Sequence, residues 1–99
     1  MGEKSEGFEQ VAHYFGLLAD PTRLHILSCL CGRERAVHEV VETVGLTQAN
    51  ISRHLNILFR EGVVDRRREG HSVFYRVVDP NFVGICDKVR TPLAGRQAG

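Results

Sequence analysis

The chain has 99 residues, of which 42% are apolar and 25% are charged, and its formal net charge is +1. This length suits one domain with one modest core. No apolar run approaches the ~20 residues of a membrane-spanning helix, so we do not expect the chain to be a membrane protein. The amino-terminal segment MGEKSEG has no apolar signal core, which favours a reducing cytoplasm, and an odd number of cysteines, three, does not suggest a disulfide framework.

The charge is unevenly divided along the chain. Residues 1–45 carry a net charge of −3, residues 46–76 carry +3, and the remaining residues add +1. A basic segment can bind phosphates, but an ordinary solvated face would carry the same charge. The charge alone therefore does not decide between a nucleic-acid partner and a plain surface.

The amino-terminal part predicts two helices. Residues 1–7 are expected to be disordered, and an amphipathic helix is expected from Phe8 to about Leu18. The apolar stripe of this helix consists of Phe8, Val11, Ala12 and Phe15. Asp20-Pro21 predicts the start of a second helix, because the carboxylate can cap it and proline fits its first position. This second helix should end near Gly32.

Residues 37–58, VHEVVETVGLTQANISRHLNIL, contain two helix-period apolar patterns separated by a short turn. The first pattern consists of Val37, Val40, Val41 and Val44, and the second of Ile51, Leu55 and Leu58. Gly45 can end the first helix in the left-handed conformation, and the Thr47 hydroxyl can accept from N–H groups that open the second helix. The pattern is that of a helix-turn-helix, which makes double-stranded DNA the leading partner.

The outer face of the second of these helices is polar. The side chains expected there are Gln48, Ala49, Asn50, Ser52, Arg53 and His54. Such side chains hydrogen-bond to base edges and phosphates, whereas a merely solvated helix would more often carry Glu and Lys. A polar surface on an ordinary helical hairpin remains the alternative for this segment.

After Gly62 the apolar pattern changes from period 3.6 to period 2. The segment VVDRRREGHSVFYRVV predicts a β-hairpin with its tip at Gly70, and a hairpin that follows a recognition helix is a wing. Basic side chains near the tip, suited to a phosphate backbone or a minor groove, are Arg66, Arg67, Arg68 and His71. Because strand side chains alternate, Arg66 and Arg68 should share one face and Arg67 should lie on the other.

A last helix is expected to begin at Asp79-Pro80 and to end at Thr91-Pro92, before a flexible tail over residues 91–99. Its apolar stripe consists of Phe82, Ile85, Cys86 and Val89. The chain is thus predicted to be mainly α with a small β-hairpin, in the order α-α-α-α-β-β-α, with one winged helix-turn-helix domain over residues 8–90. The stripes of the first and last helices predict a homodimer interface, and two-fold pairing predicts an inverted-repeat operator.

Three segments resemble the ArsR/SmtB family of small bacterial winged-helix repressors: LADPTRLHIL, VHEVVETVGLTQANISRHLNILFREGVV and RRREGHSVFYRVVDP. The resemblance covers about residues 8–90. It implies a homodimer that leaves its operator when an inducer binds, commonly a metal, a metalloid, or an oxidant or persulfide that acts on thiols. It implies DNA contacts from Thr47, Gln48, Asn50, Ser52, Arg53 and His54 in the helix, and from Arg67, Arg68, Gly70 and His71 in the wing.

Two metal sites of the family are not matched. The cysteine pair that many members carry at the start of the helix-turn-helix falls on Ala36 and His38. The zinc site of the last helix normally has Asp and His ligands, but here Asp79 is followed by Pro80 and Asn81, and no histidine lies further along. The resemblance therefore predicts that both sites are absent, and that the inducer acts elsewhere.

The remaining candidates for a sensor are Cys29, Cys31 and Cys86. On one helix, Cys29 and Cys31 would point about 160° apart, so they are not expected to chelate one ion. Cys31 shares an apolar stripe and is expected to be buried. Cys29 lies one turn beyond His25, and a neighbouring imidazole could lower the pKa of its thiol and make it reactive.

Three roles for these cysteines stay open. Some family members sense persulfide or oxidants through one cysteine on the second helix and one on the last, and Cys29 or Cys31 with Cys86 matches that arrangement by element. Alternatively, thiolates could bind As(III), Zn(II), Cd(II) or Cu(I) as an inducer, with His38 as a further candidate ligand and no cofactor otherwise required. The cysteines could also only fill apolar space.

Two other classes of function compete with a DNA-binding repressor. A winged-helix module can bind proteins without sensing an inducer, but its second motif helix would then carry an apolar or acidic outer face. An enzyme is not expected, because a Cys–His nucleophile is the only conceivable chemistry and nothing resembles a substrate pocket.

Overall fold

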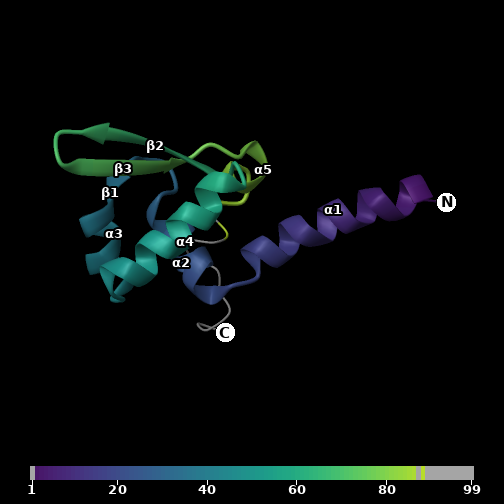
Figure 1. Ribbon diagram of the computed structural model, residues 1–99, viewed down its shortest axis with the longest axis horizontal. Helices are drawn as coiled ribbons and strands as arrows, with labels where there is room; N and C mark the ends of the chain where they lie inside the picture. The colour runs from purple at the N-terminus through teal and green to yellow at the C-terminus, as the bar shows by residue number, and fades with distance from the viewer. Residues whose placement is uncertain (1, 87, 89–99) are drawn as a thin grey trace.

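The computed structural model describes residues 2–86 and 88, and it is mainly helical with one small antiparallel sheet (Figure 1). Its elements are α1 Gly2–Leu18, α2 Pro21–Cys29, β1 Arg35–Ala36, α3 Val37–Val44, α4 Gln48–Arg60, β2 Val64–Glu69, β3 Ser72–Val77 and α5 Pro80–Val83. The predicted winged helix-turn-helix class is confirmed, with α3 and α4 as the motif and β2 and β3 as the wing. The sequence patterns missed β1, because its two residues are too short to show a period.

The ends of the described chain differ from the predicted boundaries. α1 begins at Gly2, before the expected start at Phe8, and so includes a segment that was expected to be disordered. Glu and Lys in this segment are good helix formers, which fits the longer helix. α5 ends at Val83. The expected end of the last helix at Thr91-Pro92, its Val89 and the tail over residues 91–99 lie outside the described residues.

The predicted starts of α2 and α4 and the predicted end of α3 are confirmed by their caps, whereas α2 ends at Cys29, before the expected end near Gly32. Asp20 accepts hydrogen bonds from the backbone N–H groups of Thr22 at 2.8 Å and Arg23 at 3.1 Å, which opens α2. The Thr47 hydroxyl accepts from the backbone N–H of Asn50 at 3.2 Å and opens α4. Gly45 ends α3 at a φ of 83°, the left-handed conformation that glycine adopts without strain.

The sheet has the strand order β1-β3-β2, with both pairs antiparallel. In the wing, Val64 pairs with Val77 and Glu69 with Ser72, which leaves Gly70 and His71 as a two-residue turn. Gly70 has a φ of 64°, as a tight hairpin turn requires at its first position. On the other side of β3, Arg35 and Ala36 of β1 pair with Tyr75 and Phe74, so the segment before α3 is joined to the wing.

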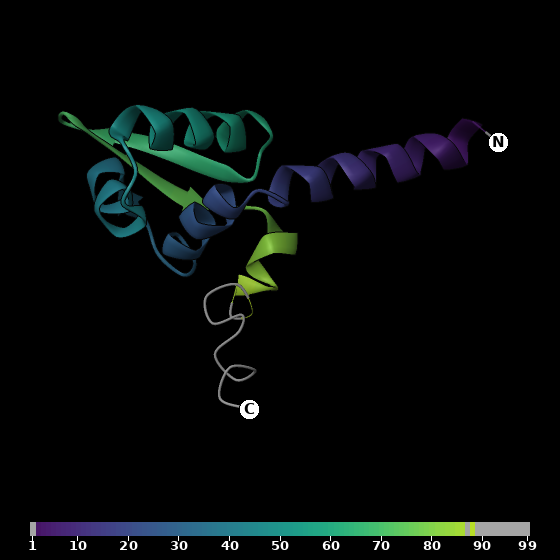
Figure 2. The same cartoon turned by 90° about the horizontal axis from the view of Figure 1, so that it is seen from below.

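The core lies where α2, α3 and α4 pack against each other and against the sheet (Figures 1 and 2). Its fully buried side chains are Ile26, Leu27, Leu30, Val40, Ile51, Leu55, Leu58, Val63, Val64 and Phe82. The predicted stripes of the two motif helices supply four of these ten residues: Val40, Ile51, Leu55 and Leu58. Phe82 anchors α5 to the same core, which holds Cys86 near the end of α2.

α1 projects away from the other elements in both views (Figures 1 and 2). Its apolar stripe is open to solvent, with Phe8 75%, Val11 51% and Phe15 62% exposed. Polar contacts hold its carboxyl-terminal half: Tyr14 donates its hydroxyl hydrogen to the carboxylate of Asp79, and burial together with this partner raises the pKa of Tyr14 to about 12. α1 therefore presents an uncovered apolar face to its surroundings.

Candidate nucleic-acid interface

The recognition helix α4 and the wing border a common cleft of about 610 Å³. The cleft is lined from α3 by His38, from α4 by Gln48 and Ser52, and from the wing by Arg66, Arg67, Arg68 and His71. Donors from the amino-terminal half of α4 and cations from the wing thus face one open surface. Such a surface can present hydrogen bonds to base edges and positive charge to phosphates at the same time.

The predicted contact residues at the start of α4 lie at the surface. Thr47, Gln48, Ser52 and Arg53 are exposed, and Asn50 is half-buried. The Arg53 Nη2 donates to Asn50 Oδ1 at 3.2 Å, so these two side chains form a pair on one side of the helix. The hydroxyl of Thr47 is used as the helix cap, which leaves Gln48, Ser52 and Arg53 as the more accessible donors and acceptors.

His54 does not lie on the outer face of α4, and that expectation is wrong. Its side chain is only 6% exposed, and its Nδ1 accepts a hydrogen bond from Arg23 Nε at 3.3 Å. The apolar period contained the signal, because His54 follows Ile51 by three residues and precedes Leu58 by four, which places it on the buried side. The polar residue type favours the outer face, but the position in the apolar stripe decides where the side chain lies.

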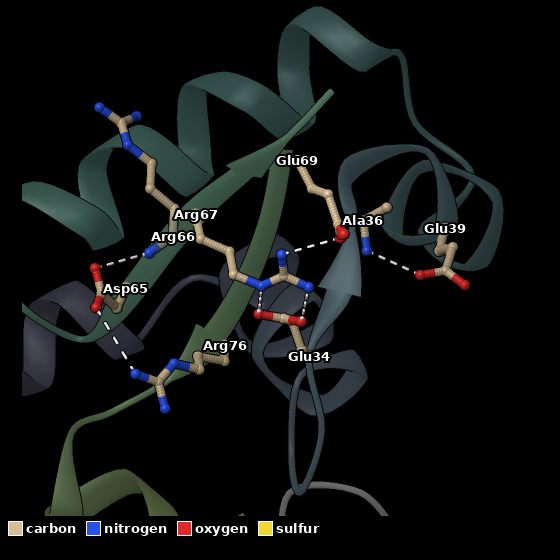
Figure 3. A network of polar contacts seen from close by, with 8 residues as sticks. All are labelled: Glu34, Ala36, Glu39, Asp65, Arg66, Arg67, Glu69 and Arg76. Carbon is tan, nitrogen blue, oxygen red and sulfur yellow. Dashed lines mark hydrogen bonds and ion pairs between the residues drawn. The ribbon is translucent and has the colours of Figure 1, made fainter. Parts of the chain in front are cut away.

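The predicted alternation of the wing arginines is confirmed. Arg66 extends over the ring of Phe59 in α4, at 4.0 Å from the guanidinium carbon to the ring centroid, and donates to the Tyr75 hydroxyl at 3.4 Å. Arg67 points in a different direction, toward Glu34 in the segment before β1 (Figure 3). Arg66 therefore connects the wing to the recognition helix, whereas Arg67 connects the wing to the segment before β1.

Two carboxylates surround the Arg67 guanidinium. Its Nε and Nη2 donate to the two carboxylate oxygens of Glu34, each at 2.8 Å, and its Nη1 donates to Glu69 at 3.0 Å (Figure 3). These contacts lower the pKa of Glu34 and raise that of Arg67, so both groups stay charged. Within the described residues, the side chains of Arg68 and His71 are exposed and make no hydrogen bond or ion pair. Arg68 is therefore the more available cation for a phosphate.

The structure brings Cys31 and Cys86 together and leaves Cys29 apart. Cys31 and Cys86 form a disulfide with their Cα atoms 5.7 Å apart, joining the end of α2 to the segment after α5. This differs from the expectation of no disulfide framework, because spacing along the chain does not reveal which cysteines meet in the fold. Cys31 is buried, as predicted.

Cys29 is free and half-buried, and burial raises the pKa of its thiol. The predicted lowering by His25 is therefore wrong in direction. His38 is exposed on α3 and lines the cleft, on a different part of the molecule from the cysteine pair. Among the residues that the structure describes, no three His, Cys, Asp or Glu side chains gather as a metal site would require.

The sequence of this chain matches a known protein family. A family model described as "Bacterial regulatory protein, arsR family" matches residues 20–66. The chain is 42% identical over 90 residues to a probable mercury resistance operon repressor of Streptomyces lividans, covering 91% of this chain and 72% of that protein. This chain belongs to the ArsR family. It is also 38% identical over 84 residues to the HTH-type transcriptional regulator Rv0081 of Mycobacterium tuberculosis, covering 84% and 74% of the two chains.

A solved relative has the same fold. The homodimeric winged helix-turn-helix DNA-binding domain Mb0332 of Mycobacterium bovis matches with a TM-score of 0.77 and 29% identity, covering 98% of this chain and 90% of that one. As a member of the ArsR family, this protein is a DNA-binding transcriptional regulator and not an enzyme. In residues 2–86 and 88, no helix is both long and apolar enough to span a bilayer.

Proposed function

We propose that this ArsR-family regulator is a homodimeric repressor that binds an inverted-repeat operator and is released by chemistry at Cys31 and Cys86. The proposal that the inducer acts on these cysteines is supported by one observation: their sulfur atoms meet in the fold although the residues are 55 positions apart in sequence. Cytosolic disulfides are usually transient and redox-sensing, so a pair of this kind suits a sensor better than a permanent staple.

The proposed DNA surface combines the start of α4 with the tip of the wing. Its contact residues are Thr47, Gln48, Asn50, Ser52, Arg53, Arg68 and His71. Gln48 and Arg53 supply the hydrogen-bonding groups suited to base edges, and Arg68 supplies a charge suited to phosphates. His54 is left out because it is buried, and Arg67 can join only when Glu34 and Glu69 release its guanidinium.

The proposed dimer uses the uncovered face of α1 together with the region of α5. A groove of about 500 Å³ lies between them, and apolar side chains in its lining are Val11, Phe15, Leu18 and Ile85. Phe8 extends this apolar surface along α1. A second copy would remove these side chains from water, and its two-fold symmetry would present two recognition helices to matching half-sites.

The proposed signal is the oxidation of two thiols to one disulfide. In the reduced form Cys31 and Cys86 are thiols and the dimer holds its operator. An oxidant such as hydrogen peroxide forms a sulfenic acid on one sulfur, and the other thiolate attacks it, releasing water. Two protons and two electrons pass from the thiols to the peroxide, which becomes two water molecules. An organic persulfide would instead transfer its outer sulfur to one thiolate: the S–S bond of the reagent breaks, an organic thiol leaves, and one cysteine becomes a persulfide.

A soft metal ion is the second candidate inducer, favoured by the similarity to a relative named as a mercury resistance operon repressor. Two thiolates on Cys31 and Cys86 would suit a soft ion that accepts two ligands. A three-thiolate site for As(III), or a four-ligand site for Zn(II) or Cd(II), would need donors that the described residues do not gather there.

The test follows operator release and thiol chemistry in one sample. The probe is a fluorescent duplex selected from a random-sequence pool by the reduced wild-type protein. Anisotropy is then followed during titration with hydrogen peroxide, an organic persulfide, arsenite, mercury(II), zinc, cadmium or copper(I). Mass spectrometry of the intact protein distinguishes a loss of two hydrogen atoms from a gain of sulfur or of a bound metal.

We expect wild-type protein to leave the duplex as the Cys31 and Cys86 thiols react. Cys31→Ser and Cys86→Ser should bind the duplex and remain bound. Cys29→Ser is the matched control, because Cys29 is free and half-buried, and it should be released like wild type. Release of Cys31→Ser at the wild-type inducer concentration would contradict the proposed sensor.

A further inference from the structure

His54 is the one buried polar side chain among the residues that the structure describes. It lies on the recognition helix α4 but points inward, so the DNA surface does not use it. Its Nδ1 lies 3.3 Å from the Nε of Arg23 in α2. A buried titratable group on the helix that reads DNA needs a reason, because burying a polar group is costly unless it is hydrogen-bonded.

The contact with Arg23 fixes the protonation state of His54. A guanidinium carries only N–H donors, so the Nδ1 of His54 must accept. The imidazole is therefore neutral and carries its proton on Nε2. The same arginine donates through Nη1 to the backbone carbonyl oxygen of Leu17 at 2.9 Å. Two hydrogen bonds thus connect the last turn of α1, the first turn of α2 and the middle of α4.

We propose that His54 is a positioning residue that holds the recognition helix against α1 and α2 only while its imidazole is neutral, so that operator binding weakens on protonation. A proton on Nδ1 would turn the acceptor into a donor that faces another donor. It would also place a second cation beside the guanidinium of Arg23. Since the ring is buried, the conflict can be relieved only if α4 shifts or the contact with α2 opens.

The charges around His54 act in both directions. Arg23 on α2 and Arg53 on α4 oppose the imidazolium, while Asp20 before α2 favours it. Burial is the largest effect, and it lowers the pKa of His54 below its ordinary value of 6.5. The neutral form therefore prevails at neutral pH. The stabilising contact is lost as the pH falls through the lowered pKa, because the unfolded or shifted state binds the proton more readily.

The experiment measures operator affinity against pH in the full chain. The probe is the duplex selected by reduced wild-type protein at about pH 7.5, and anisotropy gives Kd from about pH 8 to about pH 5 in a buffer of constant ionic strength. His54→Asn keeps an acceptor oxygen near the place of Nδ1 but does not titrate. His54→Leu removes the acceptor. His25→Asn is the matched control, because it makes the same substitution at an exposed histidine of α2 that does not line the cleft.

For wild type, Kd should rise about tenfold per pH unit once the pH is below the pKa of His54. His54→Asn should bind like wild type at about pH 7.5 and lose this rise, with Kd changing less than about twofold. His54→Leu should bind weakly at every pH while still unfolding cooperatively on heating. His25→Asn should retain the wild-type rise on acidification.

The proposed role of His54 rests on the proposed operator binding, but it does not depend on the inducer. The experiment distinguishes a failure of the repressor function from a failure of the role of His54. If reduced wild-type protein selects no duplex, the proposed repressor function is overturned, and the role of His54 with it. If His54→Asn shows the same rise in Kd on acidification as wild type, only the role of His54 is overturned. Wild-type affinity in the folded His54→Leu variant would have the same meaning.

Discussion

Arg67 shows how a basic side chain can lie on the proposed DNA-binding surface without being available to DNA. Its guanidinium is held by Glu34 through two hydrogen bonds and by Glu69 through a third. A phosphate would have to displace these carboxylates, and the same donors cannot serve both. The three consecutive arginines of β2 are thus unequal: Arg66 packs on Phe59, Arg67 is neutralised, and Arg68 is exposed.

Glu34→Gln tests this competition at the scale of one ion pair. The amide cannot hold the guanidinium by charge, and the remaining ion pair is the exposed contact with Glu69, which a phosphate can displace. Arg67 therefore becomes available to a phosphate, and operator affinity should rise. One additional phosphate contact should steepen the slope of log K against log salt concentration by about 0.9. The measurement is Kd by anisotropy over a series of salt concentrations.

Glu42→Gln is the control for the change in net charge, because Glu42 is exposed on α3 and makes no ion pair with a described residue. It should leave the salt slope unchanged. Equal slopes for Glu34→Gln and Glu42→Gln would show that Arg67 does not become a phosphate ligand when Glu34 is neutral.

The elements were predictable where the information is local. Asp20 and Thr47 act as caps within three residues of their own positions, and the alternation of Arg66 and Arg67 follows from the strand period alone. Contacts between distant segments were not predictable in this way. Glu34 with Arg67, and Cys31 with Cys86, become neighbours only after α2, the sheet and α5 pack. His54 is the intermediate case. Its position in the apolar period predicts a buried side chain, whereas its polar residue type predicts an exposed one.

The turn between α3 and α4 depends on the left-handed conformation of Gly45, whose φ is 83°. A Cβ added there would meet no other atom within 4 Å, so a substitution is strained by backbone conformation and not by crowding. Gly45→Ala should therefore lower the free energy of unfolding by about 1–2 kcal/mol. Gly45→Asn should cost less, because asparagine visits this conformation more readily. Urea unfolding followed by circular dichroism compares the two variants, and equal losses would mean that strain at φ is not the cause.

At the scale of the whole molecule, α1 is the helix whose apolar face stays exposed to solvent in a single chain. Phe8, Val11 and Phe15 form an exposed apolar patch, and a patch of this kind marks an interaction site. The Tyr14 and Asp79 contact nevertheless fixes how α1 leaves the core. A second copy that covers this face would link the two recognition helices rigidly, so dimerisation and operator affinity should change together.

Phe15→Glu tests that link. The side chain is 62% exposed, so the charge should cost the single chain little, but in a dimer it would be buried without a partner. We expect the variant to sediment as a monomer at concentrations where wild type is a dimer, and to bind the selected duplex far more weakly. Leu46→Glu, at an exposed apolar residue in the turn before α4, is the control for sedimentation and should remain dimeric. A Phe15→Glu variant that still sediments as a dimer would show that the interface lies on another face of the molecule.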